Sequence, residues 1–494
     1  MTKYIKKIIP KNNIELFSCI FLLYFIIVRF AYITSYSIDI AGIEFALIFQ
    51  QQFIEKYNMF YPNPDSFPYF ISFYPPLYPY IIKVFIEMKQ FDFFNDMHEI
   101  LVLGRELSFL IYFIIIIFLF RFFKLLKIEI KYPYLFIVLF SLLLTQHFFA
   151  FRPDSFKLLF FVIFMYYITK YELDIQARMS LHLAIFFAMI STMFKHDVAI
   201  YFILYFIVHL LTFRNVKVIK IAIYYLTIVC FIFALFTFVN GEIFLKNIFY
   251  YNIQYSSQTS QKLIGIFINI FRLSPLILFC MLNFKSENKW IRFIAFYAFT
   301  SFIISSIFLL RVGSNLNYTY ESVLLLLLNS ILYFHNKSYK KIIWILPYLS
   351  ILVFLHHTLN YKLFDFGKDM HSEKIEYYQN LETSKQLKSI IKKDVVFFPN
   401  GKFIIFNSEL NILFGYDLHL DRFTDLYLNI PISSNLYKND AVKSYDNLFE
   451  QGYVKYIVIE NEPRSLHQMS VFYPNFKYYT KCNQFLIYRY LPSI

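Results

Sequence analysis

Residues 100–120 read ILVLGRELSFLIYFIIIIFLF, an apolar run whose only charged residues are Arg105 and Glu106. A run of about 20 predominantly apolar residues is long enough for an α-helix to cross the hydrocarbon core of a bilayer. Similar apolar runs occur at residues 16–33, 133–151, 155–169, 181–194, 198–213, 218–239, 263–284, 291–310, 321–334 and 342–360. The pattern predicts an α-helical, polytopic membrane protein with about eleven transmembrane helices.

The composition of the whole chain supports this interpretation. Of its 494 residues 58% are hydrophobic and 22% aromatic, and the mean hydropathy is +0.51, which excludes an ordinary soluble globular protein. The four cysteines lie far apart and lack the spacing of a disulfide framework or a zinc site, so we expect no metal from them. Only 9 residues are glycine, which argues against a transporter built on glycine-interrupted helices.

The net charge of +14 is best explained by topology, and no nucleic-acid partner is expected. Successive loops alternate between basic and nearly neutral, with nineteen Lys and Arg residues in the predicted inner segments and six in the outer short loops. Because cytoplasmic loops carry the excess of Lys and Arg, the N-terminus is predicted to be cytoplasmic. An odd number of spans then places both long polar segments outside the cytoplasm.

Those two polar segments define the predicted domain organisation. Residues 35–99 form the first outer loop, with an interfacial helix expected over 40–56 and a proline-rich stretch, Tyr74-Pro75-Pro76-Leu77-Tyr78-Pro79. Residues 361–494 mix a polar helical stretch at 382–393 with β-like runs, which predicts a small extracytoplasmic α/β domain. Residues 1–360 are therefore the predicted transmembrane domain, and 361–494 the appended domain.

Ionisable residues collect at the same predicted membrane face. They come from five loops or helix ends: Asp39, Glu44, Arg105, Glu106, Arg152, Asp154, Lys195, Asp197, Arg311 and Glu321. Taken singly, the carboxylates could cap helices and the cations could extend their charged ends to lipid head groups. Together they indicate a functional site, because convergent ionisable groups in membrane helices are costly, and this set pairs carboxylates for base chemistry with cations for phosphate.

The order of several short motifs resembles the GT-C superfamily of glycosyltransferases that use polyprenyl-phosphate sugars. More specifically, the motifs resemble those of the branch that contains protein O-mannosyltransferases and the lipid A aminoarabinose transferase. The motifs are Ile38-Asp39-Ile40-Ala41-Gly42, the Tyr74 to Pro79 segment, Arg152-Pro153-Asp154-Ser155, Lys195-His196, and Gly313 to Tyr318 followed by Glu321. The sequence departs from the family at Ile40, where members often have Glu, and at His196, where Gln is usual.

The resemblance implies a sugar donor linked to polyprenyl phosphate, held in the membrane lipid, and an acceptor hydroxyl on a glycan, lipid or protein. Asp39 would be the general base, with Glu44 in place of the missing second carboxylate, and inversion at the anomeric carbon is expected. The donor phosphate would be bound by Arg152, Lys195, Arg311 and Arg105. Substrate or loop roles fall to Tyr74, Asp154, Asn317, Tyr318 and Glu321. No cofactor is predicted, although some relatives use a divalent metal ion.

Other interpretations predict different features. A transporter or flippase for lipid-linked glycans would carry charges near mid-membrane and show repeat symmetry between its halves, but Arg272 is the one charged residue deep in a predicted span. A glycan polymerase or ligase would share the outer-face site and transfer whole oligosaccharides. A membrane scaffold that presents residues 361–494 to a partner would leave Asp39 without a role.

Overall fold

The computed structural model describes most of the chain. The described residues are 13–36, 44–63, 72, 74–91, 96–129, 131–144, 146–173, 178–250, 259–309, 316–337, 366–398, 411–413, 448–460, 473 and 475–491. The chain divides into two compact units. Unit 1 comprises Met1–Thr34, Val102–Phe233 and Ser257–Gly367, and unit 2 comprises Ser35–Leu101, Ala234–Ser256 and Lys368–Ile494.

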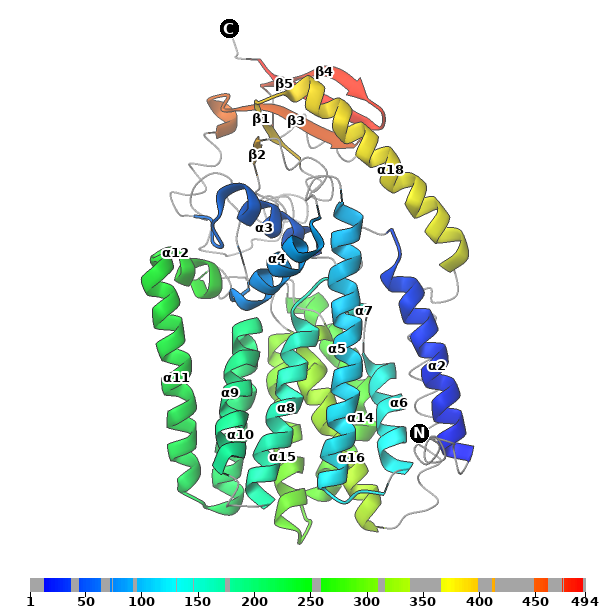
Figure 1. The fold of residues 1–494 in the computed structure, drawn as a ribbon, viewed down its shortest axis with the longest axis vertical. Coiled ribbons are helices and arrows are strands. Elements are labelled where there is room, and N and C mark those ends of the chain that lie inside the picture. Colours follow the sequence, from blue (N-terminus) through cyan, green and yellow to red (C-terminus); the bar gives the residue numbers. More distant parts are fainter. Residues whose placement is uncertain are drawn as a thin grey trace. The chain divides into compact units, whose positions relative to one another are not determined.

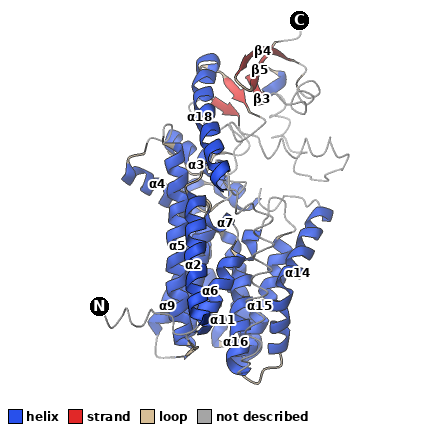
Figure 2. Ribbon diagram, turned by 90° about the vertical axis from the view of Figure 1, so that its right-hand side faces the viewer, coloured by secondary structure: helices blue, strands red, loops and turns tan. Residues whose placement is uncertain are grey.

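Unit 1 is built from helices that run side by side (Figures 1 and 2). In chain order they are α2 (Asn13–Ile33), α5 (Met97–Leu125), α6 (Lys131–Leu143), α7 (Gln146–Phe149), α8 (Asp154–Leu173), α9 (Arg178–Phe194), η1 (His196–Val198), α10 (Ala199–Phe213), α11 (Lys217–Asn240), α14 (Thr259–Asn283), α15 (Lys289–Phe308), η3 (Leu316–Thr319) and α16 (Tyr320–Lys337). The first residues of α5 and the last of α11 belong to unit 2. The single run expected at 133–151 is divided between α6 and α7.

Among the described residues, four helical stretches are long and apolar enough to cross a membrane: Met97–Leu125, His196–Phe213, Lys217–Asn240 and Lys289–Phe308. Helix α11 is instructive, since only 6% of its most apolar stretch is buried in the protein. An apolar helix with so little buried surface needs a lipid environment. The protein is therefore an integral membrane protein, while the count of about eleven spans stays a prediction because residues 338–365 lie outside the described part.

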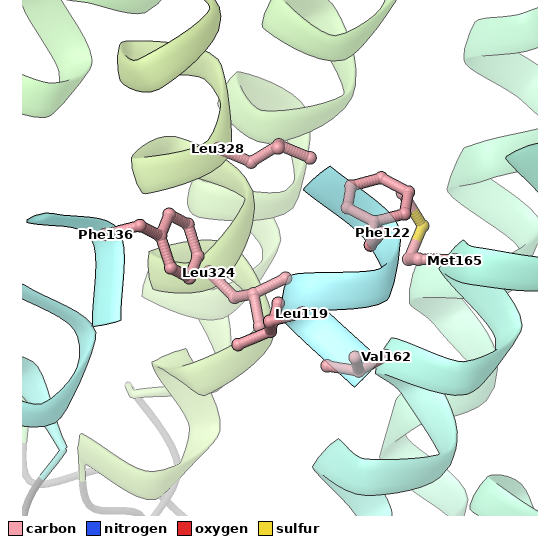
Figure 3. Close-up of a pocket in the computed structure, with 7 residues that line it drawn as sticks. All are labelled: Leu119, Phe122, Phe136, Val162, Met165, Leu324 and Leu328. Atoms are coloured by element: carbon pink, nitrogen blue, oxygen red, sulfur yellow. The ribbon is translucent and has the colours of Figure 1, made fainter. Parts of the chain in front are cut away.

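The interior of unit 1 is apolar where α5, α6, α8 and α16 meet. A small pocket there is lined by Leu119 and Phe122 of α5, Phe136 of α6, Val162 and Met165 of α8, and Leu324 and Leu328 of α16 (Figure 3). All seven lining side chains are hydrocarbon or thioether, so the pocket offers no polar group to orient a ligand. It marks the packed core between these helices.

Unit 2 contains the segment between α2 and α5, a segment after α11, and the C-terminal region. Its helices are α3 (Glu44–Tyr57), α4 (Leu77–Lys89), α12 (Glu242–Leu245), the π-helical turn η2 (Lys246–Tyr250) and α18 (Phe366–Ile391). Buried Asn247 joins two of these segments: its Oδ1 accepts a hydrogen bond from the Ser72 backbone N–H at 2.7 Å, and its Nδ2 donates to the Pro62 carbonyl at 3.0 Å. The helix expected over 40–56 is present as α3, and residues 37–43 lie outside the described part.

Helix α18 contacts the first turn of α5. The backbone N–H of His98 donates to the Tyr377 hydroxyl at 3.1 Å, and the His98 ring stacks on Tyr36 with ring centroids 3.9 Å apart. Burial raises the pKa of the Tyr377 hydroxyl, so this group stays neutral as an acceptor. The hydrogen bond connects two residues that are 279 positions apart in the chain.

The C-terminal region forms a five-stranded mixed sheet. Its strands are β1 (Val395–Phe397), β2 (Asn411–Leu413), β3 (Val454–Glu460), β4 (Phe476–Cys482) and β5 (Phe485–Tyr490), in the order β2-β1-β3-β5-β4. Strand β1 pairs in parallel with β2 and β3, whereas β5 pairs antiparallel with β3 and β4. Helix α18 lies beside the sheet (Figure 2), where the Cys482 thiol donates to Oε1 of Gln386 at 3.4 Å.

Candidate active site

The turn between α7 and α8 is held in place by α5. Gly104 lies against it so closely that an added Cβ would be 1.8 Å from Cδ2 of Phe151. One turn further along α5, the Ser108 hydroxyl donates to the Ala150 carbonyl at 3.1 Å. The small residue and the hydroxyl on one face of α5 therefore fix the backbone that leads into Asp154, the first residue of α8.

Asp154 accepts hydrogen bonds from two cationic side chains. Nε of Arg152 donates to its Oδ2 at 3.0 Å, and Nζ of Lys195 donates to its Oδ1 at 2.9 Å. The Asp154 carboxylate is fully buried and lies at the N-terminus of α8, where the helix dipole favours a negative charge. The pairing links the start of α8 to Lys195, which directly follows α9.

Lys157 extends the cluster from the first turn of α8 to α16. Its Nζ lies 3.0 Å from Oε1 and 3.2 Å from Oε2 of Glu321, and 3.7 Å from Oδ2 of Asp197. A cation near a helix N-terminus is unfavourable, and these two carboxylates compensate for it. The Lys157 and Glu321 side chains are both fully buried.

Lys195 is the central cation. Besides its bond to Asp154, its Nζ lies 3.8 Å from Oδ2 of Asp197 and 3.9 Å from the centroid of the Tyr318 ring. Tyr318 belongs to η3, and its carbonyl accepts a hydrogen bond from the Tyr201 hydroxyl at 3.0 Å. The ring is thus positioned by α10 to cover the lysine, in a cation–π contact.

The six charged residues form one alternating series that runs Arg152, Asp154, Lys195, Asp197, Lys157, Glu321. The three carboxylates lie at the N-terminal turns of α8, η1 and α16, so the ends of these helices meet in space. Their formal charges cancel. The Lys157 and Glu321 side chains are fully buried. The Arg152, Lys195 and Asp197 side chains each have 4–6% of their surface exposed, so this part of the series is slightly accessible.

The structure brings Arg152, Asp154, Lys195, Tyr318 and Glu321 together, as the sequence predicted. The remaining predicted residues divide into three groups. Glu44 and Tyr74 are buried in unit 2, and Arg105 is fully buried in α5 of unit 1. Asn317 lies in η3, but its side chain is not described. Asp39 and Arg311 lie outside the described residues.

Lys157 is the member of the cluster that the sequence analysis did not select. It is one of the six basic residues assigned to the outer short loops, and it stands near the start of an apolar run. Its position was nevertheless a usable signal. A lysine one helical turn after Asp154 lies on the same helix face, and an isolated cation followed by the apolar residues 158–165 requires a carboxylate partner.

The described residues do not fit a metal ion. Within the described ranges, no three His, Cys, Asp or Glu side chains are arranged so that they could hold one. The neighbouring carboxylates of the cluster are separated by Lys157 and Lys195, which occupy the positions that a cation would take.

The fold is similar to that of ArnT, for which two solved structures match nearly the whole chain. It is similar to a solved structure of ArnT, the lipid A aminoarabinose transferase, from Cupriavidus metallidurans in the apo state, with a TM-score of 0.61, 11% sequence identity, and coverage of 95% of this chain and 97% of that chain. A structure of the same ArnT bound to undecaprenyl phosphate gives a TM-score of 0.57 at 10% identity, with the same coverage. No protein-family model and no curated protein sequence matches the chain. The predicted resemblance in fold is confirmed.

Proposed function

We propose that the protein is a membrane glycosyltransferase that moves a sugar from a polyprenyl-phosphate donor to a hydroxyl acceptor at the extracytoplasmic face. The observation that carries this proposal is the alternating series of buried cations and carboxylates. It lies where the ends of three helices meet in a GT-C-like fold. Carboxylates in such a site can accept a proton, and its cations can supply the positive charge that stabilises a departing phosphate.

The proposed reaction is a single displacement. The oxygen of the acceptor hydroxyl attacks the anomeric carbon and forms the new glycosidic bond, while the bond from that carbon to the phosphate oxygen breaks. The hydroxyl proton passes to a carboxylate base, and the electrons of the broken bond leave with polyprenyl phosphate. One such displacement inverts the anomeric centre. Asp39 is the proposed base because of its place in the motif Ile38-Asp39-Ile40-Ala41-Gly42.

Arg152 and Lys195 are the proposed contacts for the donor phosphate. Arginine has five N–H donors and lysine three, so each can bind Asp154 and a phosphate oxygen at the same time. The phosphate gains negative charge as the bond to the sugar breaks, so fixed cations stabilise the transition state more than the bound donor. Asp154 is a positioning residue in this scheme, because it holds both cations within 3.0 Å of one carboxylate.

The identity of the carrier is supported by the comparison. The ArnT structure that is similar to 95% of this chain contains undecaprenyl phosphate, so a carrier lipid of that class is the natural proposal here. A polyprenyl donor also suits a membrane setting, since its tail can stay in lipid while its head group reaches the ends of the helices.

Sugar transfer tests the proposal. Radiolabelled sugars would be supplied on a panel of polyprenyl phosphates to membranes that contain the wild-type protein, Asp39→Asn, or the control Asp394→Asn, at equal expression. Asp394 is an exposed residue in the turn before β1. We expect transfer by the wild type and the control, and at least a hundredfold loss in Asp39→Asn. Equal transfer by all three proteins would remove Asp39 as the base.

A further inference from the structure

Asp197 differs from the other two carboxylates of the cluster. Its side chain is 4% exposed, yet neither of its carboxylate oxygens accepts a hydrogen bond from any described residue. Its nearest cations among the described residues are Nζ of Lys157, at 3.7 Å, and Nζ of Lys195, at 3.8 Å. By contrast, Asp154 and Glu321 have donors at 2.9–3.2 Å.

A buried carboxylate that accepts no hydrogen bond from the described residues needs donors from another source. Burying an ionised group without donors is costly, and nearly all buried polar atoms in native proteins are hydrogen-bonded. The two lysines supply charge but not bonds at these distances. The position therefore suits a ligand that brings its own donors to both oxygens of Asp197.

The surrounding charges limit the chemistry of that ligand. The six side chains of the cluster already balance three positive charges against three negative ones. An ammonium group at Asp197 would add a cation beside Lys157 and Lys195, both already within 4 Å of the carboxylate, and the like charges would repel it. A phosphate would be repelled by Asp197 itself. Uncharged hydroxyl groups donate without adding charge, and two neighbouring hydroxyls can serve both oxygens of one carboxylate.

We propose that Asp197 binds hydroxyl groups of an uncharged sugar head group on the donor, and so selects neutral over amino sugars. This inference rests on the proposed function. Lys195, a proposed contact for the donor phosphate, is 3.8 Å from Asp197, and both side chains lie at the slightly exposed end of the cluster. A sugar joined directly to phosphate presents its phosphate and its ring hydroxyls at a similarly short separation. One head group can therefore reach Lys195 and Asp197 together.

Lipid binding by the purified protein tests this proposal. The probes are undecaprenyl phosphate without a sugar, the same lipid carrying glucose, galactose, mannose or arabinose, and the same lipid carrying 2-amino-2-deoxyglucose without an acetyl group. The wild type should bind at least one neutral sugar lipid about tenfold or more tightly than undecaprenyl phosphate, since hydrogen bonds to a charged acceptor are among the stronger ones. It should bind the amino-sugar lipid no more tightly than the bare lipid.

Asp197→Asn should lose the preference for the neutral sugar lipid, while its Kd for undecaprenyl phosphate should not rise, because the substitution removes a negative charge that repels phosphate. The matched control Asp394→Asn should bind all the probes as the wild type does. If Asp197→Asn does not fold, Asp197→Glu keeps the charge but displaces the carboxylate by one methylene, and it should lose the same preference.

Three results would overturn the inference and leave the proposed function standing: a wild type with no preference for any neutral sugar lipid, tighter binding of the amino-sugar lipid, or an unchanged preference in the Asp197 variant. A wild type that binds none of the lipids would overturn the proposed function, and this inference with it.

Discussion

Nζ of Lys157 lies 3.0 Å from Oε1 of Glu321, and this contact joins α8 to α16 across 164 positions of the sequence. Both side chains are fully buried. A buried ion pair contributes little net stability compared with an apolar pair of the same shape, but removal of one partner leaves a charge without compensation. The pair is therefore a weak general stabiliser and a strong constraint on how α8 and α16 are placed.

Replacing Lys157 should destabilise the protein more than replacing both partners. Lys157→Met leaves the Glu321 carboxylate buried without its cation, and we expect a loss of about 3–5 kcal/mol in the free energy of unfolding. The double variant Lys157→Met/Glu321→Gln removes both charges and should recover part of this loss. Thermal midpoints of the purified variants measure the effect. A Lys157→Met midpoint equal to that of the wild type would contradict the structural role of the pair.

The contact between Gly104 and Phe151 should also be sensitive to substitution. In Gly104→Ala the new methyl group would lie 1.8 Å from Cδ2 of the buried Phe151 ring, and overpacking of this kind costs about 1–3 kcal/mol. Because the displaced turn carries Arg152 and Asp154, sugar transfer should fall as well. The double variant Gly104→Ala/Phe151→Ala relieves the clash and should regain transfer activity. Failure of the second substitution to restore any activity would show that the clash is not the cause.

Lys195 should contribute to the affinity for the carrier lipid. Lys195→Gln removes the proposed phosphate contact, and the Kd for undecaprenyl phosphate should rise about tenfold or more, since hydrogen bonds to charged groups are worth roughly 1.5–3 kcal/mol. Lys195→Arg keeps the charge and should lose less. A Kd for Lys195→Gln that matches the wild-type value would remove Lys195 from the phosphate site.

The predicted orientation can be tested by cysteine labelling. In a background without the four native cysteines, Tyr478→Cys on exposed β4 should react with a membrane-impermeant maleimide added to intact spheroplasts. Glu287→Cys, in the exposed turn between α14 and α15, should react only after the membrane is opened. The opposite labelling pattern would invert the predicted topology.

Much of the fold could be predicted from the sequence because its signals are local. Apolar runs predict most of the membrane helices to within a few residues. Of the four β-like runs predicted in residues 361–494, those at 395–399, 453–460 and 485–490 correspond to β1, β3 and β5, and the fourth, at 403–407, lies outside the described residues. Strands β2 and β4 were not predicted. Strand β2 has only three residues, and β4 is an edge strand whose sequence FKYYTKC lacks a continuous apolar run.

The site was predicted less completely, because it depends on contacts between distant parts of the chain. Motif order selected Arg152, Asp154, Lys195, Tyr318 and Glu321. Pairing could not be read from the sequence, so the link from Lys157 to Glu321 and the absence of hydrogen bonds to Asp197 among the described residues emerged only from the structure. Asp39 and Arg311 lie outside the described residues, and their roles stay predictions.

The central claim is that the protein breaks the bond between a sugar and polyprenyl phosphate, and mass spectrometry of the donor lipid tests it most directly. Native membranes, which supply donor and acceptor, would be compared with and without the wild-type protein, Lys195→Gln and the control Asp394→Asn. The account predicts conversion of the sugar-bearing lipid to polyprenyl phosphate by the wild type and the control, with little conversion by Lys195→Gln. A sugar-bearing lipid that stays chemically intact while the wild-type protein moves it between leaflets would contradict the claim and identify a flippase.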